Sequence, residues 1–219
     1  MTLAALIPAA GTGSRLGRGH KALVEVRGKS LLARSVQAFE THVDEIVVAV
    51  SPDMCQEVRA QLGDRVKLVL GGETRQASVR NLLAATEADT VLIHDAARPF
   101  LSARVIREVV LEAQNVGAAS VVMRVADTLI QVTTEAVDKT VNRQNLRAVQ
   151  TPQGFKREVI VKAHDYALEN SIEATDDAGL VRSLAHPVAL VEGSAWLMKV
   201  TTPADLEIAE ALAALWDTQ

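Results

Sequence analysis

The sequence predicts an α/β fold, in which a mostly parallel sheet is flanked by helices. Three observations support this prediction. Short apolar runs alternate with amphipathic helical patterns from Thr2 to Arg124, which is typical of repeated β-α units. Hydrophobic residues make up 48% of the chain and aromatic residues only 3%, so the core must consist of Ala, Val and Leu packed closely on the sheet. A loop of small residues follows the first apolar run directly.

The expected elements follow from these periodicities and from capping residues. Strands are expected over 2–7, 45–50, 66–70, 90–93 and 118–124, with shorter ones over 188–191 and 196–200. Helices are expected over 30–41, 52–62, 75–86, 102–115, 156–170, 175–184 and from 203 onward. Ser30 has the chemistry of an N-cap, Pro52 suits a first turn and Gly63 suits a helix end.

The β-α pattern breaks at Asp127. Residues 127–149 are rich in Thr and Val, with stretches of alternating pattern and a turn near 135–138. This pattern indicates a two-stranded β-arm that protrudes from a single domain spanning residues 1–219. Because an isolated two-stranded ribbon is only marginally stable in water, we expect the arm to pack on a partner subunit.

Composition narrows the classes of function. The net charge of −4 argues against a general nucleic-acid binder, since such proteins are usually basic. No apolar run has the length of a transmembrane helix and no signal-peptide pattern is present, so no membrane partner is expected. Cys55 is the only cysteine and cannot form an intramolecular disulfide, and we expect a cytoplasmic protein.

The first loop, from Pro8 to Lys21, has the composition of a polyphosphate site. It reads Pro-Ala-Ala-Gly-Thr-Gly-Ser-Arg-Leu-Gly-Arg-Gly-His-Lys. Small residues expose backbone N–H donors, and Arg15, Arg18 and Lys21 bring positive charge to the end of the first strand. The loop is not a Walker A motif, because it has no Gly-Lys-Ser/Thr. It also departs from the dinucleotide-binding fingerprint, because Leu16 stands at the position of the third glycine. A nucleoside triphosphate loop of the nucleotidyltransferase type fits best.

A second segment, His-Asp-Ala-Ala-Arg-Pro at 94–99, follows the strand expected over 90–93. Asp95 can hold Mg²⁺ there, directly or through water, and Arg98 can clamp a phosphate with its planar fork. Pairing of Asp95 with Arg98 at a turn is the alternative. His94 should point to the opposite face of the strand, and we do not expect it to be a catalyst.

A third loop begins at Gly71-Gly72, after the strand expected over 66–70. Backbone groups at these glycines can approach a nucleotide base closely because no Cβ intervenes. The Ser78 hydroxyl should face the same way, one turn into the next helix. A purely structural left-handed turn is equally compatible with the spacing. All three loops lie at the carboxyl ends of strands, where α/β sheets bind ligands.

Together these segments resemble one family, the 2-C-methyl-D-erythritol 4-phosphate cytidylyltransferases of the non-mevalonate isoprenoid pathway. The resemblance spans about residues 3–206 and is carried by the first loop, Gly71-Gly-x-x-Arg-x-x-Ser-Val, the 94–99 segment, Asn142-Arg143, Thr151-Pro-Gln-x-Phe and Thr175-Asp. It implies a Rossmann-like fold of the nucleotide-diphospho-sugar transferase type. It also implies transfer of CMP from CTP to 2-C-methyl-D-erythritol 4-phosphate, with Mg²⁺ or another divalent cation as cofactor and a homodimer as the assembly.

The resemblance further implies roles for individual residues. Those assigned to the nucleotide are Pro8, Ala9, Ala10, Gly11, Gly13, Arg15, Lys21, Gly71, Gly72, Ser78 and Asp95. Those assigned to the acceptor substrate are Asp95, Arg98, Thr128, Arg143, Thr151, Thr175 and Lys199. The charges of Arg15, Lys21 and Lys199 would be catalytic, and Asp95 would ligate the metal. Thr128 and Arg143 would reach the active site of the partner subunit from a swapped arm.

Three alternatives stay open. Ribitol 5-phosphate cytidylyltransferase shares the loops and the reaction, and differs in its acceptor pocket. A non-catalytic nucleotide-binding regulatory protein of the same fold would be expected to lack Lys21, Asp95 or Arg143, and all three are present. An NAD-dependent oxidoreductase is disfavoured by Leu16 and by the missing acid at the end of the second strand.

Overall fold

A computed structural model of the chain describes residues 1–11 and 19–218. Its centre is a seven-stranded sheet in the order β11-β7-β10-β6-β1-β4-β5. The strands are β1 (Leu3–Pro8), β4 (Glu45–Val50), β5 (Lys67–Leu70), β6 (Thr90–Ile93), β7 (Ala118–Arg124), β10 (Arg147–Lys156) and β11 (Ala189–Glu192). β10 runs antiparallel to both of its neighbours, and the other pairs are parallel. The predicted mostly parallel sheet is confirmed.

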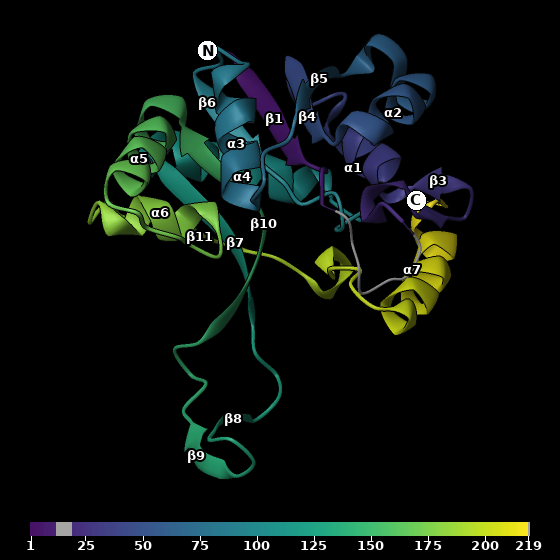
Figure 1. Cartoon of the computed structure of the whole chain (residues 1–219). Helices are drawn as coiled ribbons and strands as arrows, with labels where there is room; N and C mark the ends of the chain where they lie inside the picture. The colour runs from purple at the N-terminus through teal and green to yellow at the C-terminus, as the bar shows by residue number, and fades with distance from the viewer. Residues whose placement is uncertain (12–18, 219) are drawn as a thin grey trace.

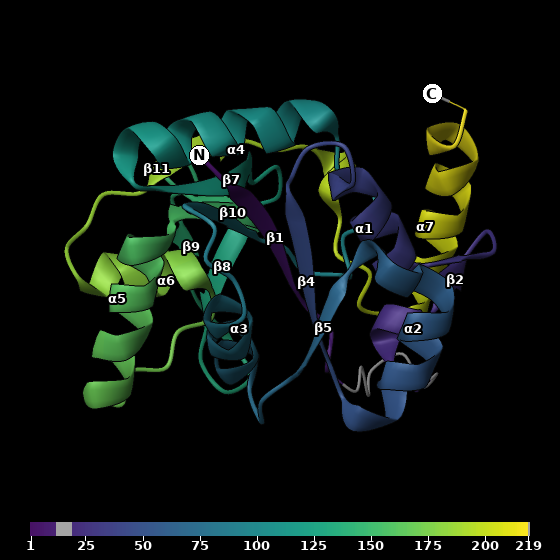
Figure 2. The same cartoon turned by 90° about the horizontal axis from the view of Figure 1, so that it is seen from above.

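Helices cover both faces of this sheet (Figure 2). One apolar cluster holds α1 (Leu31–Phe39), α2 (Cys55–Leu62) and α4 (Ala103–Val116), and a second holds α3 (Arg75–Ala84), α5 (Arg157–Glu169) and α6 (Asp177–Ser183). Along β1, Ala5 and Ile7 belong to the first cluster, whereas Ala4 and Leu6 belong to the second. This alternation is what a strand buried on both sides requires.

The last helix, α7 (Pro203–Trp216), belongs to a smaller third cluster beside the main body. It packs with the short strand β2 (Glu25–Val26) (Figure 2), which pairs with β3 (Lys29–Ser30). The expected strand over 196–200 is wrong, because a 3-10 turn, η5 (Ala195–Leu197), occupies its start. Trp196 instead packs against Trp216, with ring centroids 5.4 Å apart. Aromatic packing therefore decides the path of this segment.

Strand β10 is the main element that the sequence analysis does not anticipate. Pro152 and Gly154 both argue against a central strand. The structure accommodates the proline with a register shift between Val149 and Gln153 against β7. Gly154 lies against α4, where its missing side chain allows the helix to come close to the sheet. Tertiary packing thus overrides local strand propensity.

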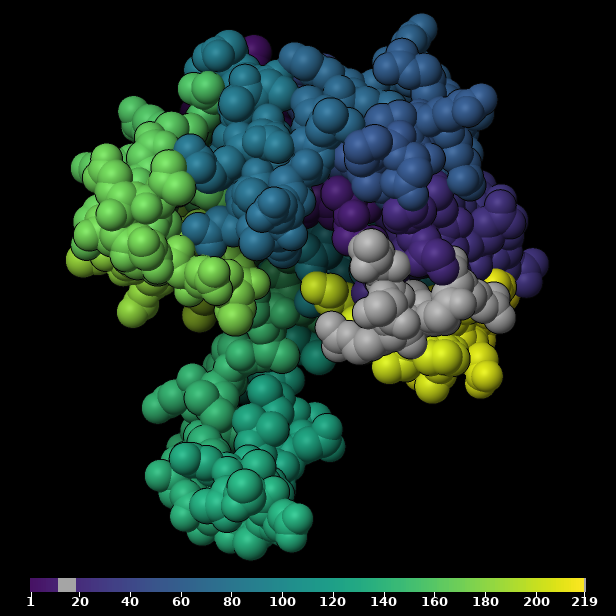
Figure 3. All heavy atoms as spheres, in the orientation of Figure 1, coloured from purple at the N-terminus to yellow at the C-terminus, as the bar shows by residue number. Residues whose placement is uncertain are grey.

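The predicted arm is present as an antiparallel pair, β8 (Leu129–Val132) and β9 (Val137–Val141). It projects from the body of the molecule as a separate lobe (Figures 1 and 3). Ile130, Val132 and Val137 are 48%, 62% and 61% exposed. Pairing within the arm therefore leaves an apolar stripe uncovered.

We predict that Gly154→Ala lowers the free energy of unfolding by about 1–3 kcal/mol, the usual cost of overpacking a core. A Cβ at this position would lie 2.6 Å from Val109 Cγ1 and 3.1 Å from Ala113 Cβ, both on α4. Urea denaturation measures the change, provided that the m-value is unaltered. A variant as stable as the parent protein would show that α4 moves off the sheet without cost.

Candidate active site

A cavity of about 380 Å³ lies at the carboxyl ends of the central strands. The loop after β1, the loop between β5 and α3, the segment after β6 and Lys199 form its walls. The volume is in the range of small-molecule sites, and the predicted convergence of three loops is confirmed. The predicted residues that line the cavity are Pro8, Ala9, Ala10, Gly11, Lys21, Gly72, Ser78, Asp95 and Lys199. Gly13 and Arg15 lie outside the described residues.

Gly71 and Gly72 allow two loops to pack closely. Neither has a backbone φ in the left-handed region, so the left-handed-turn alternative is excluded. A Cβ on Gly71 would collide with the Cβ of Ala10 in the first loop. The Ser78 hydroxyl accepts a hydrogen bond from the Gly72 N–H and donates one to the Thr74 carbonyl, both at 3.0 Å. Ser78 therefore fixes the shape of the loop, and its contact with a nucleotide stays a prediction.

Lys21 and the residue before it enter the site from the other end of the first loop. Lys21 opens a 3-10 turn, η2 (Lys21–Leu23), and lines the cavity. His20 directly precedes Lys21, and its Nε2 lies 2.5 Å from Oδ2 of Asp53. A side-chain contact thus tethers the residue before Lys21 to the 3-10 turn at Pro52–Met54.

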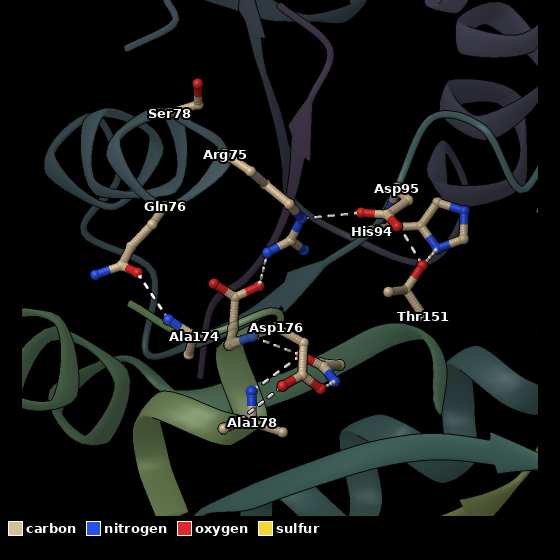
Figure 4. Close-up of polar contacts among 12 residues, drawn as sticks. Arg75, Gln76, Ser78, His94, Asp95, Thr151, Ala174, Asp176 and Ala178 are labelled. Atoms are coloured by element: carbon tan, nitrogen blue, oxygen red, sulfur yellow. Dashed lines mark hydrogen bonds and ion pairs between the residues drawn. The ribbon is translucent and has the colours of Figure 1, made fainter. Parts of the chain in front are cut away.

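Asp95 lines the cavity and lies between two cations, Arg75 and Lys199; Figure 4 shows its contact with Arg75. Its Oδ1 accepts a hydrogen bond from Arg75 Nε at 3.2 Å, and its Oδ2 accepts one from Lys199 Nζ at 2.7 Å. Burial raises the pKa of Asp95, but the charges of Arg75 and Lys199 outweigh burial and hold the pKa well below its usual range. The carboxylate is therefore ionised at neutral pH.

Arg98 lies behind the cavity and does not belong to its described lining. Its guanidinium donates to the carbonyl of Leu197 at 2.5 Å and to that of Val149 at 3.3 Å. Its contact with Asp95 is a backbone turn, in which Arg98 N–H donates to the Asp95 carbonyl at 3.0 Å. The structure thus gives Arg98 a framework role, and its contact with an acceptor phosphate stays a prediction.

Thr151 on β10 and His94, the residue before Asp95, hold the Asp95 segment in place (Figure 4). The Thr151 hydroxyl accepts from the Asp95 N–H at 3.1 Å and lies 3.1 Å from His94 Nδ1. His94 Nε2 lies 3.0 Å from the Arg98 carbonyl. Burial lowers the pKa of His94 to about 4, so the imidazole is neutral at pH 7. The pair positions the backbone that carries Asp95.

Arg75 and Asp177 are functional candidates to which the sequence analysis gives no role. Arg75 Nη1 donates to Asp177 Oδ2 at 2.8 Å while its Nε contacts Asp95. Burial lowers the pKa of Arg75, but Asp177 and Asp95 outweigh burial and raise it above its ordinary value. The arginine of the Gly-Gly-x-x-Arg motif could have been singled out from sequence. Nothing in the sequence connects it with a residue 102 positions away.

The other predicted acceptor residues lie outside the cavity in the described part of the chain. Thr175 is exposed in the loop before α6. This loop is tied to α3 by Gln76, which donates to the Ile172 carbonyl at 3.1 Å. Thr128 and Arg143 are exposed at the base of the arm. The roles implied for these three residues stay predictions.

The family model of IspD, 2-C-methyl-D-erythritol 4-phosphate cytidylyltransferase, matches residues 3–214. The chain belongs to this family. The cytidylyltransferase of this name from Deinococcus radiodurans is 54% identical over 209 residues, covering 95% of this chain and 88% of that protein. The one from Thermus thermophilus is 47% identical over 216 residues, covering 99% of both chains.

Solved structures agree with this assignment. The crystal structure of 2-C-methyl-D-erythritol 4-phosphate cytidylyltransferase from Thermus thermophilus superposes with a TM-score of 0.85 at 43% identity. The superposition covers 98% of this chain and 100% of that chain. The Francisella tularensis enzyme of the same name gives a TM-score of 0.83 at 30% identity, covering 96% of this chain and 99% of that chain. The predicted fold class and nucleotidyltransferase class are thereby confirmed.

Asp95 is the side chain best placed to hold a divalent cation. Among residues 1–11 and 19–218, no group of three or more His, Cys, Asp or Glu side chains could hold a metal ion. Mg²⁺ in nucleotide enzymes is usually bound by one or two carboxylates together with substrate phosphates. The donor set therefore fits a metal that binds jointly with a phosphate-bearing ligand.

We predict that Asp95→Asn lowers the free energy of unfolding at pH 7 by about 1–2 kcal/mol, less than for a fully buried ion pair, because Lys199 is 42% exposed and Arg75 keeps Asp177 as a counter-ion. Because the pKa of Asp95 is lowered in the folded state, this stabilisation is complete above the unfolded-state pKa of about 3.9. It is lost as the pH falls further toward the folded-state pKa. Urea unfolding from pH 7 down to pH 3 should show the difference shrinking at the acid end; a constant difference would contradict the prediction.

Proposed function

We propose that this protein transfers CMP from CTP to 2-C-methyl-D-erythritol 4-phosphate and releases pyrophosphate, as a step of the non-mevalonate isoprenoid pathway. One observation carries the proposal. In a chain of this family, Lys21, Asp95 and Lys199 face a single cavity beside a loop of small residues. The relatives' names supply the acceptor, and the charges around the cavity suit two phosphate-bearing substrates.

The chemistry needs charge and alignment more than proton transfer. A phosphate oxygen of the acceptor attacks the α-phosphorus of CTP in line, and the bond to the bridging oxygen of the leaving pyrophosphate breaks. The nucleophile is already an anion, so no general base is required. Two polyanions must instead be brought together and the developing charge stabilised. We assign Arg15 and Lys21 to the triphosphate and Lys199 to the acceptor phosphate.

Backbone and metal would complete the nucleotide site. The Ala9 N–H already donates to the Ala49 carbonyl at 2.8 Å, so we assign the N–H groups of Ala10 and Gly11 to the phosphates, just beyond the end of β1, where such loops bind them. Mg²⁺ or another divalent cation, when bound, would neutralise charge on the triphosphate. Asp95 would hold it.

We predict that Lys21→Ala lowers turnover by at least about 10²-fold, the scale for losing one preorganised electrostatic group. Steady-state pyrophosphate release measures the effect. Lys29→Ala is the matched control, because Lys29 is exposed on β3 and contacts Gln37 away from the cavity. Near-normal turnover of Lys21→Ala would remove this lysine from the mechanism.

The acceptor is tested by offering 2-C-methyl-D-erythritol 4-phosphate and ribitol 5-phosphate separately with CTP and Mg²⁺. Pyrophosphate release with the first acceptor alone supports the proposal. Release with ribitol 5-phosphate would keep the reaction type and overturn the acceptor. CTP binding with no release from either would favour a regulatory nucleotide-binding protein.

We also propose a homodimer formed through the arm. The exposed stripe of Ile130, Val132 and Val137 is the kind of apolar surface that a second chain covers. Thr128 and Arg143 lie close by in sequence and would then reach the partner's active site.

The proposed location is the cytoplasm. No helix within residues 1–11 and 19–218 is long and apolar enough to cross a membrane.

We predict that Val132→Asp converts the dimer into monomers, because a charge would be buried at the centre of the stripe. Light scattering coupled to size exclusion measures the assembly. Leu168→Asp is the matched control, since Leu168 on α5 is 59% exposed and lies outside the arm. An unchanged mass for Val132→Asp, or an equal loss in both variants, would count against the arm as the interface.

A further inference from the structure

The position of Asp95 raises a question about how it could serve a ligand. Both of its carboxylate oxygens already accept hydrogen bonds from cations, Oδ1 from Arg75 and Oδ2 from Lys199. A carboxylate committed to two cations is a poor ligand for a third. Asp95 can bind a metal or nucleotide only if its two present partners have other anions to pair with.

For Lys199 this anion would be the acceptor phosphate. Its side chain is 42% exposed and faces the cavity in which that phosphate would bind. Arg75 is less free to move, since its guanidinium contacts both Asp95 and Asp177. Its contact with Asp177 is the shorter one, at 2.8 Å against 3.2 Å. Arg75 therefore already has a second counter-ion.

Asp177 is more deeply buried than Asp95. Its side chain is 1% exposed, compared with 12% for Asp95. The Gln153 side-chain carbonyl on β10 accepts hydrogen bonds from the backbone N–H groups of Asp177 and Ala178, both at 3.0 Å. Oδ1 of Asp177 lies 3.5 Å from Nε2 of the buried His164 on α5. The sheet thus holds the backbone that carries Asp177, and Arg75 on α3 binds the carboxylate itself.

We propose that Asp177 is a positioning residue, which neutralises Arg75 so that Asp95 is available to the metal-bearing nucleotide. The inference rests on the proposed function, in which Asp95 holds the metal. With Asp177 present, Arg75 keeps a counter-ion when Asp95 turns to its ligand. Without the charge of Asp177, Asp95 becomes the remaining carboxylate partner of Arg75 in the described part of the chain, and a tighter charge-assisted pair competes with the metal.

Asp177→Asn tests this inference because the amide keeps the size of the side chain and can still accept a hydrogen bond from Arg75. CTP is titrated calorimetrically into the full-length protein in EDTA and again in saturating Mg²⁺. The readout is the dissociation constant in EDTA divided by the dissociation constant in Mg²⁺. This ratio measures the coupling between metal and nucleotide. We expect this ratio to fall at least about fivefold in the variant, a loss at the low end of typical couplings. The affinity in EDTA should be unchanged or higher, because one negative charge has been removed from the site.

Two further variants separate this role from a structural one. Asp217→Asn removes a carboxylate from the Arg34 ion pair, whose shorter contact is 2.8 Å, away from the cavity. It should leave the ratio unchanged. Arg75→Gln combined with Asp177→Asn removes the cation together with its counter-ion, and should restore the ratio toward the parent value. A double variant that behaves like Asp177→Asn would overturn the proposal.

The remaining outcomes are equally decisive. Weaker binding of CTP by the same factor with and without Mg²⁺ would show that Asp177 only maintains the shape of the site. A parent protein whose CTP affinity does not respond to Mg²⁺ would also overturn the inference, even if it turns over substrate normally. Absence of both CTP binding and pyrophosphate release in the parent protein would instead overturn the proposed function itself.

Discussion

A buried negative charge at the end of β6 is the constraint on which the site depends. Asp95 is 12% exposed and carries its charge at the floor of the cavity. An isolated carboxylate in such a place would be protonated, because desolvation is expensive for an ion. Arg75 from the start of α3 and Lys199 from the segment before α7 keep it ionised. The site is therefore a network of charges, in which each member needs the others.

This network explains why elements far apart in the chain meet at one edge of the sheet. Arg75 draws α3 toward the N-terminal end of α6, where Asp177 is held by Gln153 on the antiparallel strand β10. Thr151 on the same strand fixes the backbone of Asp95. Strand β10 thus supports both carboxylates that flank Arg75, and it does so because it crosses the sheet beside β6.

Much of this arrangement was predictable from the sequence. The first loop, the Gly71-Gly72 turn and the segment containing Asp95 could all be placed at the carboxyl ends of strands, because local periodicity locates strands and parallel topology fixes their ends. The alternation of strands and helices and the departure of the arm near Asp127 follow from the same local patterns. Family membership follows from the motifs.

The tertiary structure alone decided which partners those residues have. Arg98 suggested a phosphate clamp, but its hydrogen bonds go to the carbonyls of Leu197 and Val149. β10 became a central strand despite Pro152, because a register shift accommodates the proline. Arg75 found Asp177 across 102 positions of sequence. Local patterns report propensity and periodicity, whereas the pairing of distant charges depends on the order of strands in the folded sheet.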